Sequence, residues 1–370
     1  SEPFGKYCGR KRQVNFLDKK RNKTYNYWVM SVTSRELVKQ AINFENPFRA
    51  PRHLWALPAA TDKYPNEYKK LLEKFPLDFV DIDGHLKENS PVLKGDAYKM
   101  GEYTDEWGCT FLNIQEGLIG EVKNPLVSDW EKDVNKVHFP DEWLTIDIDQ
   151  INKDCGNTDK FTLAGCCPRP FEQLQFIRGT ANLYMDLADP PKEMLTFMKK
   201  MHNLYTDVLE AWGKTDIDMF NFMDDWGSQR SLLISPEMWR HYFKLMYKDY
   251  VQIAHKAGKK IFMHSDGYIL SIFPDIVEIG VDVINSQIFC IGIEKLKPYS
   301  GKITFMGEID RQHILTEGTT DDVHNAVKKV YDTLWKNGGC IAQCEFGPSA
   351  KPENIFQVFE SWEQLTNKSG

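Results

Sequence analysis

The sequence lacks several patterns that would assign it to other classes of protein. It contains no Cys-x-x-Cys pair, so a structural zinc finger or a dithiol redox site is not expected. No apolar run approaches the roughly 18 residues that span a bilayer, which argues against a membrane protein. The formal net charge of -7 argues against a general nucleic-acid surface. The start of the chain is polar and basic instead of carrying a secretory apolar segment, and we expect a cytoplasmic protein.

The cysteines and aromatic residues that are present indicate a reduced protein with a large core. Eight cysteines are scattered irregularly along the chain, which favours reduced thiols over a disulfide framework. Ten Trp and twenty-two Phe are enough both to fill a core and to line a pocket for an apolar ligand. Composition alone does not separate these two uses.

Strands and helices alternate over most of the chain. Eight strand-like segments are recognised, at residues 49–58, 78–84, 161–165, 219–223, 261–267, 281–287, 303–308 and 338–347. A right-handed succession of eight such βα units closes into a (β/α)8 barrel, so we predict a single barrel domain over residues 31–370. The alternative is an open doubly wound sheet, but no glycine-rich phosphate loop follows the first strand.

Two regions depart from this alternation. Residues 1–30 form a basic arm, for which two interpretations stay open: a solvated or oligomer-forming extension, or a docking surface for an acidic partner. Residues 86–150 contain short strand-like runs separated by Gly and Asn, and we predict a hairpin-rich insertion after the second strand. Trp107 and Phe111 in this insertion either line a substrate pocket or only pack the hairpin on the barrel.

A candidate metal site lies where the strand at residues 261–267 ends. Side chains on a strand alternate faces, so His264 and Asp266 project to the same side. We expect Cys344, at the tip of the last strand, to meet them around a zinc ion. The alternative is a core histidine with satisfied hydrogen bonds beside a turn aspartate.

Other polar side chains follow the remaining strands and should share this face of the barrel. Asp224 and Asp225 come after one strand, and because adjacent carboxylates often cap the next helix, we expect Asp224 to be structural and Asp225 to belong to the site. Gln287 and Glu308 are candidates by their place at strand ends alone. A register error of one residue would turn either side chain away from the pocket.

Several short motifs in order resemble the uroporphyrinogen decarboxylase superfamily, and within it the branch of cobalamin-dependent methyltransferases. The resemblance covers about residues 31–367. It rests on Ser34-Arg35-Glu36-Leu37-Val38 followed by Arg49-Ala50-Pro51, on Ile234-Ser235-Pro236-Glu237-Met238-Trp239, on His264-Ser265-Asp266-Gly267 followed by residues 274–282, and on Cys344 before Pro352-Glu353-Asn354. The fold that it implies is the same (β/α)8 barrel.

The resemblance implies a zinc ion held by a His-x-Cys strand end and a later cysteine. His264 and Cys344 match that pattern, whereas Asp266 stands where the pattern has cysteine. Replacing a thiolate by a carboxylate leaves a more Lewis-acidic zinc, which suits an ether oxygen better than a thiol. Trp55, in the first strand-like segment, stands where the decarboxylase has an arginine-rich stretch, and it suits an apolar ligand better than a polyanion.

The expected activity is therefore demethylation of a methoxylated, aromatic small molecule by a methyltransferase. The methyl group would pass to the cobalt of a corrinoid carried by a separate partner protein, because this chain has no Asp-x-His-x-x-Gly sequence of the kind that ligates cobalt in such carriers. Asp225 or Glu308 would protonate the leaving phenolate as a general acid. The alternatives are transfer from methyl-corrinoid to a thiol or folate, a cofactor-free decarboxylase, and a binding module on an inactive barrel.

Overall fold

The computed structural model describes residues 11–18, 23–30, 32–82 and 85–367. Within the predicted arm, β1 (Lys11–Asp18) and β2 (Lys23–Met30) pair antiparallel, with Lys11 opposite Met30. The rest of the arm, residues 1–10 and 19–22, lies outside the described residues. Both interpretations of the arm therefore stay predictions.

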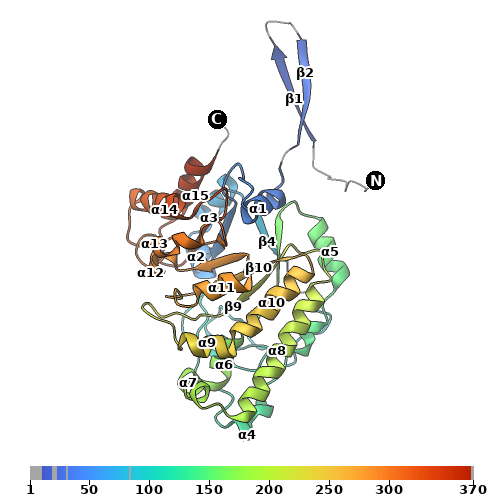
Figure 1. Cartoon of the computed structure of the whole chain (residues 1–370), viewed down its shortest axis with the longest axis vertical. Coiled ribbons are helices and arrows are strands. Elements are labelled where there is room, and N and C mark those ends of the chain that lie inside the picture. Colours follow the sequence, from blue (N-terminus) through green and yellow to red (C-terminus); the bar gives the residue numbers. More distant parts are fainter. Residues whose placement is uncertain (1–10, 19–22, 31, 83–84, 368–370) are drawn as a thin grey trace.

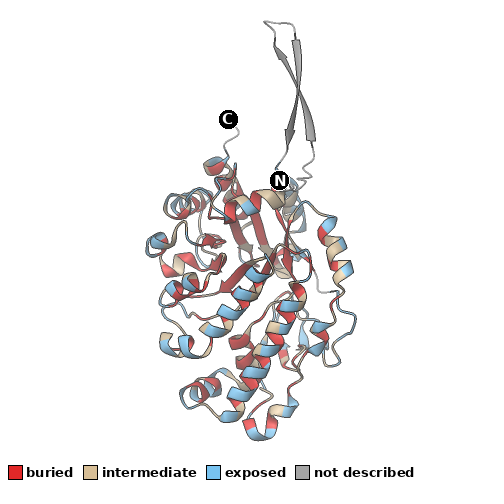
Figure 2. Cartoon of the chain, turned by 45° about the vertical axis from the view of Figure 1, so that its right-hand side comes forward, coloured by how far each residue is buried: buried red, intermediate tan, exposed pale blue. Residues whose placement is uncertain are grey.

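Eight parallel strands form the centre of the molecule, and most of their residues are buried (Figure 2). They are β3 (Arg52–Ala56), β4 (Phe79–Ile82), β8 (Phe161–Ala164), β9 (Met219–Met223), β10 (Lys260–Ser265), β11 (Val283–Ser286), β12 (Thr304–Phe305) and β13 (Ala342–Phe346). Six of them pair in the order β12-β11-β10-β9-β8-β4, and β13 pairs with β3. Within the six-stranded sheet, consecutive barrel strands lie side by side, and the last barrel strand pairs with the first.

Backbone hydrogen bonds close the two remaining gaps in the ring. The Ile341 N–H donates to the carbonyl of Phe305 over 2.9 Å, which joins the chain entering β13 to β12. The Asp78 N–H donates to the carbonyl of Arg52 over 2.9 Å, which joins the chain entering β4 to β3. The eight strands therefore form a closed ring, and the predicted (β/α)8 barrel is confirmed.

Helices surround the strands on the outside of the barrel (Figure 1). They are α1 (Ser34–Ile42), α2 (Pro58–Lys63), α3 (Pro65–Lys74), α6 (Pro170–Arg178), α7 (Thr180–Ala188), α8 (Lys192–Trp212), α9 (Pro236–Tyr242), α10 (Lys244–Lys256), α11 (Phe273–Ile279), α12 (Ile288–Ile291), α13 (Ile293–Leu296), α14 (Thr320–Leu334) and α15 (Pro352–Thr366). In the described part of the chain, no helix is both long and apolar enough to cross a membrane.

The chain between β4 and β8 adds a small antiparallel sheet to the barrel. Its strands are β5 (Gly101–Thr104), β6 (Thr110–Asn113) and β7 (Glu121–Val122), paired in that order, and α4 (Trp130–Asp133) and α5 (Ile148–Gly156) follow. Trp107 is buried against Phe197 of α8, and Phe111 packs edge-on against Phe176 of α6 at a centroid distance of 5.0 Å. These aromatic contacts attach the insertion to the helices beside the barrel mouth.

His53 of β3 lies inside the barrel among apolar rings. Its imidazole meets Phe79 edge-on at 5.2 Å between centroids, and its Nδ1 has no hydrogen-bond partner within the described chain. Burial lowers the pKa of His53 to about 3. The folded barrel therefore holds this ring in its neutral form over most of the acidic range.

This neutral histidine should make the protein sensitive to acid. Below pH 6.5 the unfolded chain binds a proton at this imidazole, whereas the folded chain binds it only near pH 3, so the free energy of unfolding falls as pH falls through that window. From pH 7 to 5 this group accounts for a loss of about 2 kcal/mol. We measure the free energy of unfolding in urea at pH 7 and at pH 5. Between these values it should fall by about 2 kcal/mol less in His53→Phe than in wild type. The exposed His241→Phe is the matched control, and equal pH dependence of all three proteins would contradict the prediction.

Candidate metal centre and adjoining cavity

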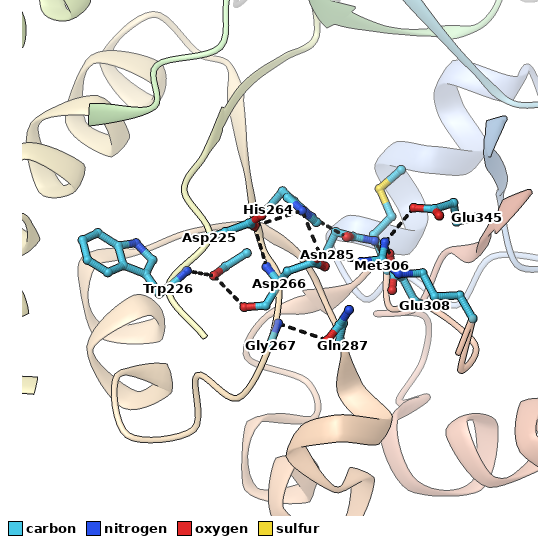
Figure 3. A network of polar contacts seen from close by, with 12 residues as sticks. Asp225, Trp226, His264, Asp266, Gly267, Asn285, Gln287, Met306, Glu308 and Glu345 are labelled. Atoms are coloured by element: carbon cyan, nitrogen blue, oxygen red, sulfur yellow. Dashed lines mark hydrogen bonds and ion pairs between the residues drawn. The ribbon is translucent and has the colours of Figure 1, made fainter. Parts of the chain in front are cut away.

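Three potential ligands of a metal ion meet where β9 and β10 end. Asp225 follows β9, His264 is the penultimate residue of β10, and Asp266 comes directly after that strand. Their ligand atoms all lie within 4.8 Å of one another (Figure 3). The His264 Nε2 is 3.5 Å from the Asp225 carboxylate and 3.8 Å from the Asp266 carboxylate.

The hydrogen bonds of Asn285 orient the imidazole of His264. The amide nitrogen of Asn285 donates to the carbonyl of Met306 over 2.5 Å and to Gln343 Oε1 over 3.2 Å, so its oxygen faces the histidine. His264 Nδ1 lies 2.7 Å from that oxygen and must therefore be the donor (Figure 3). The lone pair of Nε2 then faces the two carboxylates, as in a metal-binding histidine held by an outer partner.

The hydrogen bonds of the two carboxylates leave one oxygen of Asp266 available to a cation. The Asp225 Oδ1 accepts the backbone N–H of Asp266 over 2.9 Å. Asp266 binds Arg311 through Oδ2, whereas its buried Oδ1 has no hydrogen-bond partner within the described chain. A buried oxygen without a partner is costly unless a cation or a donor approaches it. One nitrogen and two carboxylates form a donor set that zinc accepts, so these residues fit a divalent ion.

Two glycines let the loops that carry these carboxylates cross in direct contact. A Cβ atom at Gly227 would lie 2.3 Å from the backbone nitrogen of Tyr268, and one at Gly267 would lie 2.0 Å from the carbonyl oxygen of Gly227. The Gly227 N–H donates to the carbonyl of Asp266 over 3.1 Å. No side chain fits at either position, and the crossing holds the loop of Asp225 against the loop of Asp266.

Arg311, in the loop after β12, connects the metal candidates to two further acids. Its Nη1 donates to Glu308 over 3.0 Å and to Glu345 over 2.6 Å, and its Nη2 binds Asp266. Burial raises the pKa of Glu308 to about 8, the nearby Asp266, Glu345 and Asp225 add to this, and Arg311 opposes it. Glu308 is therefore mostly protonated at neutral pH and can donate a proton.

Cys344 does not join Asp225, His264 and Asp266. The prediction that this thiol is the third ligand is wrong, because the side chain of β13 that faces the site is one residue further along. In the parallel pairing of β13 with β3, Cys344 stands opposite Leu54 and Glu345 stands opposite Trp55. The Trp55 ring packs on His264 inside the barrel at a centroid distance of 4.9 Å, and Glu345 shares that face. Cys344 is buried in the apolar layer between strands and helices. Glu345, not the thiol, thus reaches the site.

The other residues that the sequence analysis singled out fall into three places. Trp55 is beside His264, and the Gln287 side-chain oxygen accepts the N–H of Gly267 over 3.2 Å at the edge of the cluster. Asp224 is buried and accepts the N–H groups of Phe171 and Glu172 at the start of α6, a structural role. Trp107 and Phe111 lie apart from these residues, in the wall of a separate cavity.

This cavity, of about 690 Å³, lies between the insertion, the loop after β8 and α8. Its size is that of a small-molecule site. The walls combine aromatic side chains with polar and charged ones, and the residues that bear on function are Trp107, Phe111, Trp143, Cys167, Arg169 and Glu172. Trp107 and Phe111 line this cavity and also pack the insertion onto the helices, and their role in substrate binding stays a prediction.

Glu172 connects the cavity to the metal candidates. Burial raises the pKa of this carboxyl to about 7, the nearby Asp225 adds to the rise, and Arg169 and His264 oppose it. Glu172 therefore interacts electrostatically with the cluster while lining the cavity. Our sequence reading missed both Arg169 and Glu172. Polar residues that follow a barrel strand are candidates for the site. Arg169 and Glu172 both follow β8, so the same rule would have included them.

Comparisons with known proteins agree with the fold. The sequence model of the uroporphyrinogen decarboxylase (URO-D) family matches residues 105–365. No curated protein sequence matches the chain. A solved structure of a methyltransferase from Methanosarcina mazei aligns over 90% of this chain and 99% of its own, with a TM-score of 0.62 and 14% identity, which shows a shared fold.

Two other solved structures align less well. A B12-independent methionine synthase from Shewanella sp. W3-18-1 covers 87% of this chain and 94% of its own at a TM-score of 0.42 and 11% identity. The IOLI protein with a zinc atom covers 86% of this chain and 98% of its own at a TM-score of 0.38 and 13% identity. At these scores neither similarity supports a statement about this chain.

Proposed function

The chain belongs to the uroporphyrinogen decarboxylase family, and on that premise we propose that it is a zinc-dependent methyltransferase acting on a methoxylated aromatic molecule. It would transfer the methyl group to the cobalt of a corrinoid on a separate protein. Support for methyl transfer comes from the fold shared with the Methanosarcina mazei methyltransferase. Support for an ether as substrate comes from the site itself.

The observation that carries the proposal is the donor set of Asp225, His264 and Asp266. All three offer nitrogen or oxygen, and no thiolate is among them. A zinc ion bound there would supply Lewis acidity toward the ether oxygen of the substrate. A thiolate-rich site would instead suit the activation of a thiol acceptor, so the ligand chemistry favours demethylation over the reverse transfer.

The residues around the donor set provide the remaining requirements of ether cleavage. Breaking the bond between methyl carbon and oxygen leaves a phenolate, which Glu308 can protonate because its pKa is raised to about 8. Arg311 binds Glu308 and Asp266 together, so it holds the acid and the ligand carboxylate in one arrangement. Trp55 provides an apolar surface beside His264 for an aromatic ring.

The direction of methyl transfer can be tested by following the cobalt spectrum. The zinc-loaded protein is incubated with cob(I)alamin and a series of methoxyarenes, and separately with methylcobalamin and thiol or folate acceptors. We expect methylcobalamin to form in the first mixture and to persist in the second, with no change in either for His264→Ala. Consumption of methylcobalamin in the second mixture alone would support the reverse reaction. Release of carbon dioxide from a carboxylated ligand without a cobalt change would support a decarboxylase.

A further inference from the structure

Four polar side chains form an arc inside the barrel that ends at the candidate metal centre. His264 on β10 stands opposite Asn285 on β11, and Gln343 on β13 stands opposite His53 on β3. The amide nitrogen of Asn285 donates to Gln343 Oε1 over 3.2 Å, which joins the two pairs. All four side chains are buried. Bulky branched residues usually fill the interior of such a barrel, so this polar arc needs a reason other than packing.

Two atoms at the far end of the arc have no hydrogen-bond partner within the described chain. They are Gln343 Nε2 and His53 Nδ1. The amide nitrogen can only donate, whereas a neutral imidazole offers one lone pair as acceptor. Burial lowers the pKa of His53 to about 3, so its ring is neutral at neutral pH. The two atoms are therefore complementary, and a rotamer change or one bridging water can join them.

The direction of the two amides decides which nitrogen of His264 carries its proton. When Gln343 Nε2 points to His53, Gln343 Oε1 faces Asn285 and accepts from its nitrogen. The carbonyl of Met306 accepts from the same nitrogen over 2.5 Å (Figure 3). The Asn285 oxygen then lies 2.7 Å from His264 Nδ1, which donates to it. With both amides reversed, Asn285 would donate to Nδ1, and His264 would carry its proton on Nε2.

We propose that Gln343 and His53 are positioning residues that set the tautomer of His264 through Asn285. This inference deepens the proposed function, and it rests on it for the zinc ion that Nε2 would bind. Neutral His53 accepts from Gln343, which fixes the direction of both amides. The lone pair of His264 Nε2 is thereby kept free for a metal ion, because the hydrogen bond of one ring nitrogen determines the state of the other.

The tautomer can be measured without zinc or turnover. Long-range proton–nitrogen NMR correlation is recorded on metal-free protein labelled with nitrogen-15 histidine, at about pH 9, where free histidine is neutral. The signal of His264 is identified by its loss in His264→Ala. We expect the proton on Nδ1 in wild type, and distributed over both nitrogens in Gln343→Met and in His53→Phe.

Zinc affinity, measured by competition with a chelator, provides a second readout. It should fall by about ten-fold in Gln343→Met and in His53→Phe, the lower end of the range for residues that support a metal ligand. The matched control is Gln173→Met, because Gln173 is also a buried glutamine but donates to Asp105. This variant should keep the zinc affinity and the tautomer of wild type.

A double variant separates the direction of the amides from packing. Asn285→Asp places a carboxylate beside His264 Nδ1, and because a carboxylate only accepts, it has no direction that Gln343 could set. In this background we expect Gln343→Met to change neither the tautomer nor the zinc affinity. An effect of Gln343→Met that persists there would arise from packing and would overturn the inference.

Three further outcomes would also count against the inference. A proton that stays on Nδ1 in Gln343→Met, or an equal loss of zinc affinity in Gln173→Met, would overturn it. If Gln343→Met does not fold, His53→Phe tests the arc from its other end, and an unchanged tautomer there would overturn the role of His53. A tautomer that depends on Gln343 in a protein that binds no zinc would keep this inference and reject the proposed function.

Discussion

Replacing His264 by alanine or Asp225 by asparagine should remove zinc from the purified protein and abolish demethylation. The first change deletes one of the donors that converge within 4.8 Å, the second replaces a carboxylate by a neutral amide that binds zinc far more weakly, and the acids around them stay uncompensated. Loss of a residue that hydrogen-bonds to a metal ligand costs about 10- to 100-fold in metal affinity or activity. Loss of a ligand itself should therefore cost at least about 100-fold. Asn285→Ala, which removes the partner of His264, should fall in that lower range. Metal content per chain and the rate of methylcobalamin formation measure these effects.

Cys344→Ser is the matched control for these ligand variants. The thiol faces the helices, so its replacement should leave the zinc content unchanged, whereas a ligand of zinc could not be changed without loss of metal. The result that contradicts this assignment is zinc retained in Asp225→Asn and lost in Cys344→Ser. That outcome would mean that β13 turns its thiol inward in the metal-bound protein.

Glu308→Gln should lower the demethylation rate by about 10²- to 10⁴-fold, the usual contribution of a positioned general acid. Burial raises the pKa of Glu308, so the wild-type rate should fall ten-fold per pH unit at alkaline pH, where this carboxyl loses its proton. Glutamine cannot transfer a proton, so the alkaline decline should disappear in the variant. A pH profile of single-turnover methyl transfer measures both effects.

The leaving group of the substrate provides the control for this second prediction. A methyl ether of a nitrophenol releases a stable phenolate and needs little protonation, so Glu308→Gln should slow it much less than the ether of an unactivated phenol. An equal loss with both ethers would show that Glu308 acts by holding Arg311 in place and not by donating a proton.

The strands could be predicted from the sequence because each is a short apolar run bounded by glycine or polar residues. His264 and Asp266 were paired correctly on one side by the alternation of strand side chains. The same alternation was available for β13, where Ala342, Cys344 and Phe346 are apolar and face the helices. The thiol of Cys344 is the better zinc ligand by its chemistry, but that pattern directs Gln343 and Glu345 to the inside of the barrel.

The cavity could not be derived from the sequence for a different reason. Its walls come from the insertion, the loop after β8 and α8, which are far apart along the chain. No local periodicity reports how the insertion folds back onto these helices, because that contact is made by Trp107 and Phe111 across long sequence separations. Arg169 therefore looked like an ordinary loop arginine.

The crossing of the two loops at Gly227 and Gly267 bears on which ions this site admits. The Gly227 N–H donates to the carbonyl of Asp266 and the Tyr268 N–H donates to the carbonyl of Ser228, so moving the carboxylates of Asp225 and Asp266 apart would break main-chain hydrogen bonds and not only change rotamers. Calcium requires six to eight oxygens at about 2.3–2.6 Å, whereas zinc takes fewer donors at about 2.0–2.2 Å. Such a main-chain restraint would favour a small ion such as zinc over calcium.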